Sequence, residues 1–204
     1  MSAQWGVVVP VKRLDIAKSR LSSYGDAHRR ELALAFAADV VLAASTVAQV
    51  LVVTDDPQAR ELLASLGAQV TADDPDAGLN PALAHGADLL REQSPGLAVA
   101  TLSADLPALL APDLTAVLAR VPTDGRGFVA DLAGTGTTLL AASPGQELLP
   151  AYGPGSRESH RQSGAVELIA PESVRRDVDT PEDLEHAVSL GVGPHTLAAL
   201  QGIW

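Results

Sequence analysis

The sequence contains no cysteine and very few aromatic residues. Without cysteine, disulfides and thiolate-bound metals are excluded. Aromatic residues make up 3% of the chain and hydrophobic residues 47%, so a core must be built mainly from Ala, Leu and Val. No apolar run reaches the ~18 residues that a membrane helix needs. The apolar run at residues 5–11 is followed by positive charge, whereas a signal peptide begins with it. These absences predict a soluble, cytoplasmic, folded protein.

Basic residues are also scarce, and their placement is uneven. The chain has 14 Lys and Arg against 25 Asp and Glu, which gives a formal net charge of -11 and argues against a nucleic-acid partner. Both of its lysines, Lys12 and Lys18, lie in one short segment together with Arg13 and Arg20. Such a segment is ordinarily a solvated helix start. The gathering of both lysines favours the binding of an anion instead.

Apolar runs alternate with segments of helical period along most of the chain. Strands are expected at residues 5–11, 49–56, 68–74, 96–107 and 127–134, and helices at residues 26–45, 57–67, 80–93 and 111–122. An antiparallel strand at 136–143, a last strand at 166–171 and a closing helix at 180–191 follow. The alternation predicts a single α/β domain over residues 1–204, with a mostly parallel sheet covered by helices on both faces.

Charged residues follow the expected strands, where ligands bind in open α/β sheets. The basic segment follows the first strand, and aspartates follow the next three, including Asp105 in "SADLP". An anion held together with a metal ion, such as a nucleoside triphosphate with Mg²⁺, would explain one basic and three acidic strand ends. Asp105 alone is typical of a turn. Asp177 or Asp179 would supply the second carboxylate of a metal site.

Helix-start patterns accompany several of these residues. Thr180, Pro181 and Asp183 predict a capping box. Asn80 before Pro81 predicts an N-cap, and Ser156 predicts another. Residues 78 and 79 add backbone groups that a nucleotide base could contact. The isolated histidines at positions 85 and 160 are not expected to bind metal.

Six motifs in order carry a family resemblance: "PVKRLDIAKSRL", "GLNPAL", "SADLP", "GTGTT", "YGPGS" and "DVDTPEDL". Together they resemble the 2-phospho-L-lactate guanylyltransferases of coenzyme F-420 biosynthesis and their phosphoenolpyruvate-using relatives. These enzymes are MobA-like nucleotidyltransferases with a nucleotide-diphospho-sugar-transferase-like, Rossmann-like three-layer fold. The first motif is the most specific, because it stands where molybdenum-cofactor and sugar-nucleotide enzymes carry a glycine-rich loop.

The resemblance implies an enzyme that transfers GMP from GTP to phosphoenolpyruvate or 2-phospho-L-lactate and releases pyrophosphate. Another phosphorylated acid such as 3-phosphoglycerate is a further possible acceptor. The alternatives are a MobA-like enzyme with a sugar-phosphate or molybdopterin acceptor, and a GTP-binding module without catalysis. The roles that the resemblance implies are the following: Lys12, Lys18, Ser19 and Arg20 hold the triphosphate; Gly78, Leu79 and Asn80 contact the nucleotide; Thr138, Gly153 and Ser156 bind the acceptor; and Asp105 with Asp179 or Asp177 binds Mg²⁺. Lys12, Lys18, Arg20 and Asp105 would carry the catalysis.

Overall fold

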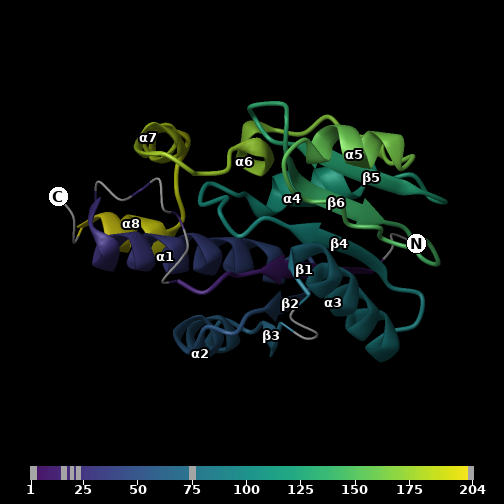
Figure 1. The fold of residues 1–204 in the computed structure, drawn as a ribbon, viewed down its shortest axis with the longest axis horizontal. Coiled ribbons are helices and arrows are strands. Elements are labelled where there is room, and N and C mark those ends of the chain that lie inside the picture. Colours follow the sequence, from purple (N-terminus) through teal and green to yellow (C-terminus); the bar gives the residue numbers. More distant parts are fainter. Residues whose placement is uncertain (1–3, 15–17, 19–20, 22–23, 74–76, 202–204) are drawn as a thin grey trace.

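A seven-stranded sheet forms the centre of the computed structural model, which describes residues 4–14, 18, 21, 24–73 and 77–201 (Figure 1). The strands are β1 (Trp5–Pro10), β2 (Gln49–Val53), β3 (Gln69–Thr71), β4 (Ala98–Leu102), β5 (Arg126–Ala130), β6 (Thr137–Ala142) and β7 (Val166–Glu167). Their order across the sheet is β3-β2-β1-β4-β6-β5-β7. Only β6 is antiparallel to its neighbours, β4 and β5. The predicted mostly parallel mixed sheet is confirmed.

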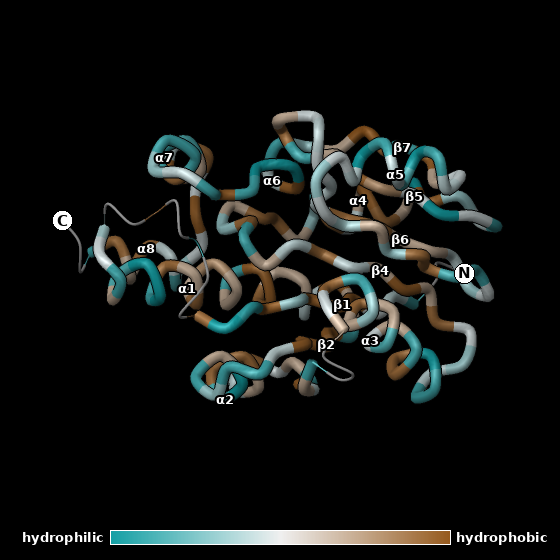
Figure 2. The backbone as a smooth tube through the Cα atoms, viewed as in Figure 1, coloured by the Kyte–Doolittle hydropathy of each residue, from teal (hydrophilic) through white to brown (hydrophobic). Residues whose placement is uncertain are grey.

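Helices cover both faces of this sheet. They are α1 (Asp26–Ser45), α2 (Pro57–Ser65), α3 (Leu79–Gln93), α4 (Ala111–Leu118), α5 (Ser156–Gln162), α6 (Glu172–Arg175), α7 (Pro181–Leu190) and α8 (Pro194–Gln201). Side chains alternate along β1: Val7 and Val9 pack in the cluster that includes α1 and α2, and Val8 packs with α3. Hydrophobic residues accordingly concentrate along the strands, and hydrophilic ones on outer helices such as α7 (Figure 2).

Helix α1 has the predicted bounds and is buried on two sides. Ala37 and Val41 belong to the cluster against the sheet, whereas Leu32 and Phe36 pack with residues of α7 and α8. The buried carboxylate of Asp39 accepts hydrogen bonds from the backbone N–H groups that begin α8. A single helix therefore joins the sheet to the two last helices of the fold. No helix in the described ranges is long and apolar enough to cross a bilayer.

Two predictions near the end of the described chain were wrong. The last strand is Val166–Glu167 and does not extend to residue 171, because β7 pairs with β5 only opposite Gly127 and Phe128. Ile169 beyond it is 83% exposed. The helix at 181–190 is not the closing one either, since α8 follows it, and the short helix α6 precedes it.

Candidate active site

One lysine and two aspartates meet beyond the carboxyl ends of β1 and β4. The Lys18 ammonium donates a hydrogen bond to Asp105 Oδ2 and another, 2.8 Å long, to Asp179 Oδ1. The Lys18 side chain is only 11% exposed, against 25% for Asp105 and 48% for Asp179. Lys18 also has a backbone φ of 53°, a conformation uncommon for residues other than glycine. A strained backbone thus directs a buried ammonium between two carboxylates from distant parts of the chain.

Backbone contacts explain why the two aspartates meet. Asp105 follows β4, and its carbonyl accepts a hydrogen bond from Val178 N–H at 3.0 Å, which places the segment before α7 beside it. The predicted capping box at the start of α7 is confirmed for Thr180 and Asp183. Asp183 Oδ2 also accepts from Asp179 N–H at 3.2 Å. The helix cap therefore fixes the backbone from which Asp179 reaches Lys18.

The site carries more negative than positive charge. Burial alone would lower the pKa of Lys18, but the charges and hydrogen bonds of Asp105 and Asp179 outweigh it and raise that pKa above its ordinary value. Burial and, to a smaller extent, the negative charges of Asp105 and Asp179 together raise the pKa of Asp177 to about 7. Asp105 Oδ1 is buried without a hydrogen-bond partner. An additional cation would offset the excess negative charge of this site and give Asp105 Oδ1 a partner.

The basic segment is anchored where it leaves β1. Leu14 N–H donates to Asp56 Oδ2 at 3.0 Å, and the other carboxylate oxygen of Asp56 caps α2. Lys12 is exposed, and among the described residues the ion pairs of Asp105 and Asp179 are with Lys18 and not with Lys12. Ser19 and Arg20, also predicted to hold the triphosphate, lie outside the described residues. Asp56 is a structural part of the site region that the sequence pattern did not single out.

The start of α3 differs from the prediction in one respect. The residue that caps the helix is Gly78, with a φ of 100°, and not Asn80. Leu79 and Asn80 are instead its first two residues. The Asn80 side chain accepts a hydrogen bond from Tyr152 N–H at 2.7 Å and donates one to the Tyr152 carbonyl at 3.0 Å. The hydrogen-bond partner of the Asn80 amide is therefore Tyr152, 72 positions away, which a local sequence pattern cannot reveal.

The predicted acceptor residues lie around the start of β6 and of α5. Gly155, in the left-handed conformation, caps α5, so the prediction of Ser156 as the N-cap was wrong. Ser156 is the first helical residue, and it is buried. Thr138 is buried too, and its hydroxyl donates to the Val174 carbonyl at 2.7 Å. That Thr138 binds the phosphorylated acid that accepts the guanylyl group stays a prediction. It requires the hydroxyl to turn away from the Val174 carbonyl.

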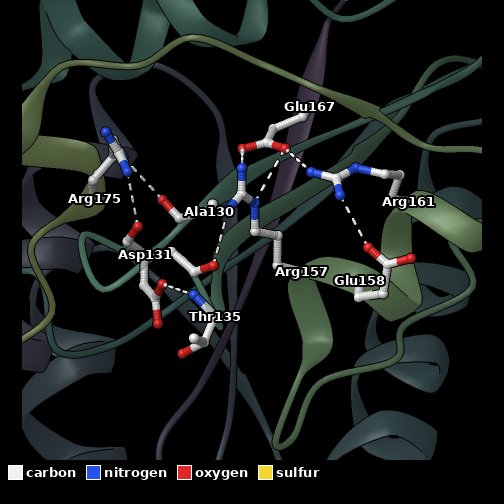
Figure 3. Close-up of polar contacts among 9 residues, drawn as sticks. Ala130, Asp131, Thr135, Arg157, Glu158, Arg161, Glu167 and Arg175 are labelled. Atoms are coloured by element: carbon white, nitrogen blue, oxygen red, sulfur yellow. Dashed lines mark hydrogen bonds and ion pairs between the residues drawn. The ribbon is translucent and has the colours of Figure 1, made fainter.

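An ion-pair network fixes the turn between β5 and β6 against α5 (Figure 3). Asp131 accepts from the backbone N–H groups of Thr135 and Gly136 at 2.9 and 2.8 Å. Arg157, the second residue of α5, donates to the Gly134 carbonyl at 3.0 Å and pairs with Glu167. The turn and the first residues of α5 are therefore held in one arrangement, which sets where Thr138 and Ser156 lie.

His160 is a second residue whose importance the sequence did not reveal. The residue is fully buried, Nε2 accepts from Ala151 N–H at 3.0 Å, and Nδ1 lies 2.9 Å from the Thr137 hydroxyl. Because Nε2 is an acceptor, the ring is neutral with its proton on Nδ1. Burial, with a smaller effect from the charge of Arg126, lowers the pKa of His160 to about 4.

His160 is expected to make stability depend on pH. Its pKa falls from 6.5 when unfolded to about 4 when folded, so the unfolded state binds more protons between these values. The stability due to neutral His160 is full above pH 6.5 and is lost as pH falls towards 4, by on the order of 3 kcal/mol. We expect His160→Gln to be less stable than the wild-type protein at pH 7.5, and this difference in the free energy of unfolding, measured with urea, to shrink by pH 4.5. A deficit that is constant with pH would contradict the assignment.

The carboxylate pair fits a divalent cation. Among the residues described, no group of three or more acidic or histidine side chains is placed to hold a metal alone. Mg²⁺ needs only one or two protein carboxylates when phosphate oxygens and water complete its shell. The unpartnered Oδ1 of Asp105, with Asp179 facing it across Lys18, provides two carboxylates of the kind that such a shell uses.

Comparisons with known proteins identify the family to which the chain is similar. The profile of the family "Guanylyl transferase CofC like" matches residues 5–203. The phosphoenolpyruvate guanylyltransferase of Streptomyces scabiei (strain 87.22) is 57% identical over 206 residues, covering 96% of this chain and 95% of the relative.

Solved structures share the fold at lower identity. A candidate nucleotide-diphospho-sugar transferase from Desulfovibrio desulfuricans G20 has a TM-score of 0.73 and 17% identity, covering 98% of this chain and 95% of that one. The manganese complex of Rv0371C from Mycobacterium tuberculosis H37Rv has a TM-score of 0.57 and 21% identity, covering 92% and 99%. Since the family profile spans nearly the whole chain and the relative matches it end to end, the chain belongs to the guanylyl transferase CofC-like family.

Proposed function

We propose that the protein transfers the guanylyl group of GTP to phosphoenolpyruvate. The observation that carries the proposal is the meeting of Lys18, Asp105 and Asp179 at the carboxyl edge of the sheet, in a chain of the guanylyl transferase family. The specificity for phosphoenolpyruvate is supported by the relative from Streptomyces scabiei, which bears that name and is 57% identical.

The reaction needs charge and alignment rather than a base. A phosphate oxygen of the acid forms a bond to the α-phosphorus of GTP, and the bond from that phosphorus to the oxygen bridging to the β-phosphorus breaks. Its electron pair leaves with pyrophosphate. The attacking phosphate is already ionised, so no proton has to be removed. Both reactants are polyanions, and the protein must offset their repulsion and hold them in line, a contribution of ~7–11 kcal/mol in favourable cases.

On the nucleotide side, we assign the triphosphate to Lys12 and Lys18. Lys18 is held close to the aspartates, and Lys12 is exposed at the end of β1. The Arg20 guanidinium would add positive charge to this segment, and the Ser19 hydroxyl would donate a hydrogen bond to the triphosphate. Gly78, Leu79 and the backbone of Asn80 would contact the guanine nucleotide, since the Asn80 amide is already used by Tyr152.

A divalent cation is part of this proposal, with Mg²⁺ as the ion. Asp105 and Asp179 would hold it, in preference to Asp177, because these two share Lys18. When bound, the ion supplies positive charge to the phosphate oxygens. The manganese complex of the Mycobacterium tuberculosis protein supports a divalent ion in this fold.

The decisive experiment is mass spectrometry of the products from GTP, Mg²⁺ and one candidate acid at a time. We expect a guanylylated phosphoenolpyruvate and an equal amount of pyrophosphate. If 2-phospho-L-lactate or 3-phosphoglycerate is turned over as fast as phosphoenolpyruvate or faster, phosphoenolpyruvate is not the preferred acceptor. Product from a sugar phosphate would point to a different MobA-like activity. If the protein binds GTP but forms no product with any acid, it is a GTP-binding module without catalytic activity.

Ser156→Ala is expected to raise the KM for phosphoenolpyruvate about tenfold and to leave that for GTP within about twofold. A hydrogen bond to a charged group contributes about 1.5–3 kcal/mol, and the loss of one from the acceptor carboxylate would produce this effect. Steady-state kinetics with each substrate varied in turn measure both constants. Ser159→Ala, an exposed serine of the same helix, is the matched control. A larger effect on GTP would place the acceptor elsewhere.

A further inference from the structure

The side chain of Asn80 binds the backbone of Tyr152 in both directions. Oδ1 accepts from Tyr152 N–H at 2.7 Å, and Nδ2 donates to the Tyr152 carbonyl at 3.0 Å. An amide side chain provides a donor and an acceptor side by side, which matches the N–H and C=O groups of one backbone residue. The backbone N–H and C=O groups of Tyr152 are thus both hydrogen-bonded to α3, as they would be to a neighbouring strand.

The two residues lie at the junction of the two proposed substrate sites. Asn80 directly follows Gly78, the N-cap of α3, and Leu79, its first residue, which lie on the proposed nucleotide side. Tyr152 directly precedes Gly153, which lies three residues before Ser156 on the acceptor side. The pair connects the segments that would hold the two reacting molecules.

Other contacts fix the same loop, but to different elements. The Tyr152 hydroxyl lies 2.6 Å from the Thr101 hydroxyl of β4, and Ala151 N–H donates to His160 Nε2 of α5 at 3.0 Å. These contacts tie the loop to the sheet and to α5. Among the hydrogen bonds of the described residues, those of Asn80 are the ones that tie it to the start of α3.

We propose that Asn80 is a positioning residue that sets the acceptor loop relative to the bound nucleotide. The inference rests on the function proposed above. In-line attack requires the acid's phosphate oxygen to meet the α-phosphorus at close range, and a displacement of about 1 Å can cost a hundredfold in rate. By holding Tyr152 through its backbone, Asn80 fixes that distance without touching either substrate through its side chain.

Asn80→Ala tests the proposal, with Thr101→Val as the matched control. Asn80→Ala removes both bonds to the loop. Thr101→Val removes the hydroxyl partner of Tyr152 and leaves the Asn80 bonds intact. We expect Asn80→Ala to lower kcat about a hundredfold and to raise the KM for phosphoenolpyruvate, with direct GTP binding within about twofold of wild type. Thr101→Val should lower the Tm by a comparable amount and keep kcat within about threefold.

Three results would overturn the assignment, and none depends on a variant failing to fold. Equal weakening of GTP and acid binding in Asn80→Ala would make Asn80 a nucleotide ligand. A lower Tm with unchanged kcat would make it merely structural. If kcat falls equally in Asn80→Ala and Thr101→Val, the effect comes from increased mobility of the whole loop and not from the contact with Asn80. Amide hydrogen exchange at Tyr152 checks the contact itself, and should be faster in Asn80→Ala. Absence of product from the wild-type protein would instead refute the proposed function.

Discussion

Asp105→Asn is expected to lower kcat/KM for guanylyl transfer by at least a hundredfold, which is about 2.7 kcal/mol of transition-state stabilisation. The substitution keeps the side-chain volume and removes one of the two negative charges that flank Lys18. It also replaces the buried, unpartnered Oδ1 or its neighbour with an amide nitrogen, which repels a cation. Pyrophosphate release from GTP and phosphoenolpyruvate measures the effect.

The loss should be specific to the site and not a result of unfolding. Asp124→Asn removes the same charge from an exposed position and is the control. We expect Mg²⁺ to raise the Tm of the wild-type protein in the presence of GTP, and to raise that of Asp105→Asn much less. Full activity of Asp105→Asn would refute the metal site.

Lys18→Met is expected to lower kcat/KM by at least a hundredfold and to change the response to metal. Methionine keeps much of the length of lysine but leaves Asp105 and Asp179 facing each other without the ammonium. We expect stability without metal to fall by roughly 1–3 kcal/mol, between the values for exposed and for buried ion pairs. Since the ammonium no longer competes for the carboxylates, Mg²⁺ should raise the Tm more than in the wild-type protein.

Lys12→Met separates the two lysines. Lys12 is exposed and carries the same charge, so its loss should raise the KM for GTP without changing metal-free stability. Thermal unfolding across a Mg²⁺ titration compares the three proteins. If Mg²⁺ shifts the Tm of Lys18→Met no more than that of wild type, Lys18 does not occupy the cation's surroundings.

Much of the fold follows from local patterns in the sequence. Helix α1 has the predicted bounds, since apolar residues recur at a helical period from residue 26 to residue 45, and most strands are short apolar runs. The capping box at Thr180 needs only three nearby residues. The family resemblance is confirmed by a profile that covers residues 5–203. These features depend on neighbours in the chain, which a local pattern records.

Features that depend on distant contacts could not be predicted in this way. Asn80 has the pattern of an N-cap, but the backbone of Tyr152 offers its amide two bonds, and Gly78 caps the helix instead. The structural role of His160 could not be predicted, because its hydrogen-bond partners, Ala151 and Thr137, are brought next to it only by the fold.

The carboxylate of Asp39 has a consequence for the newly made chain. Its partners at the start of α8 include Thr196, 157 residues further along. A ribosome adding roughly 5–20 residues per second needs roughly 8–30 s to cover that distance. During this interval the nascent polypeptide has neither the hydrogen bonds from α8 to Asp39 nor the α8 residues that pack with Phe36. Helix α1 can therefore reach its native burial only late in translation, and until then its apolar outer side lacks the cover that α8 provides.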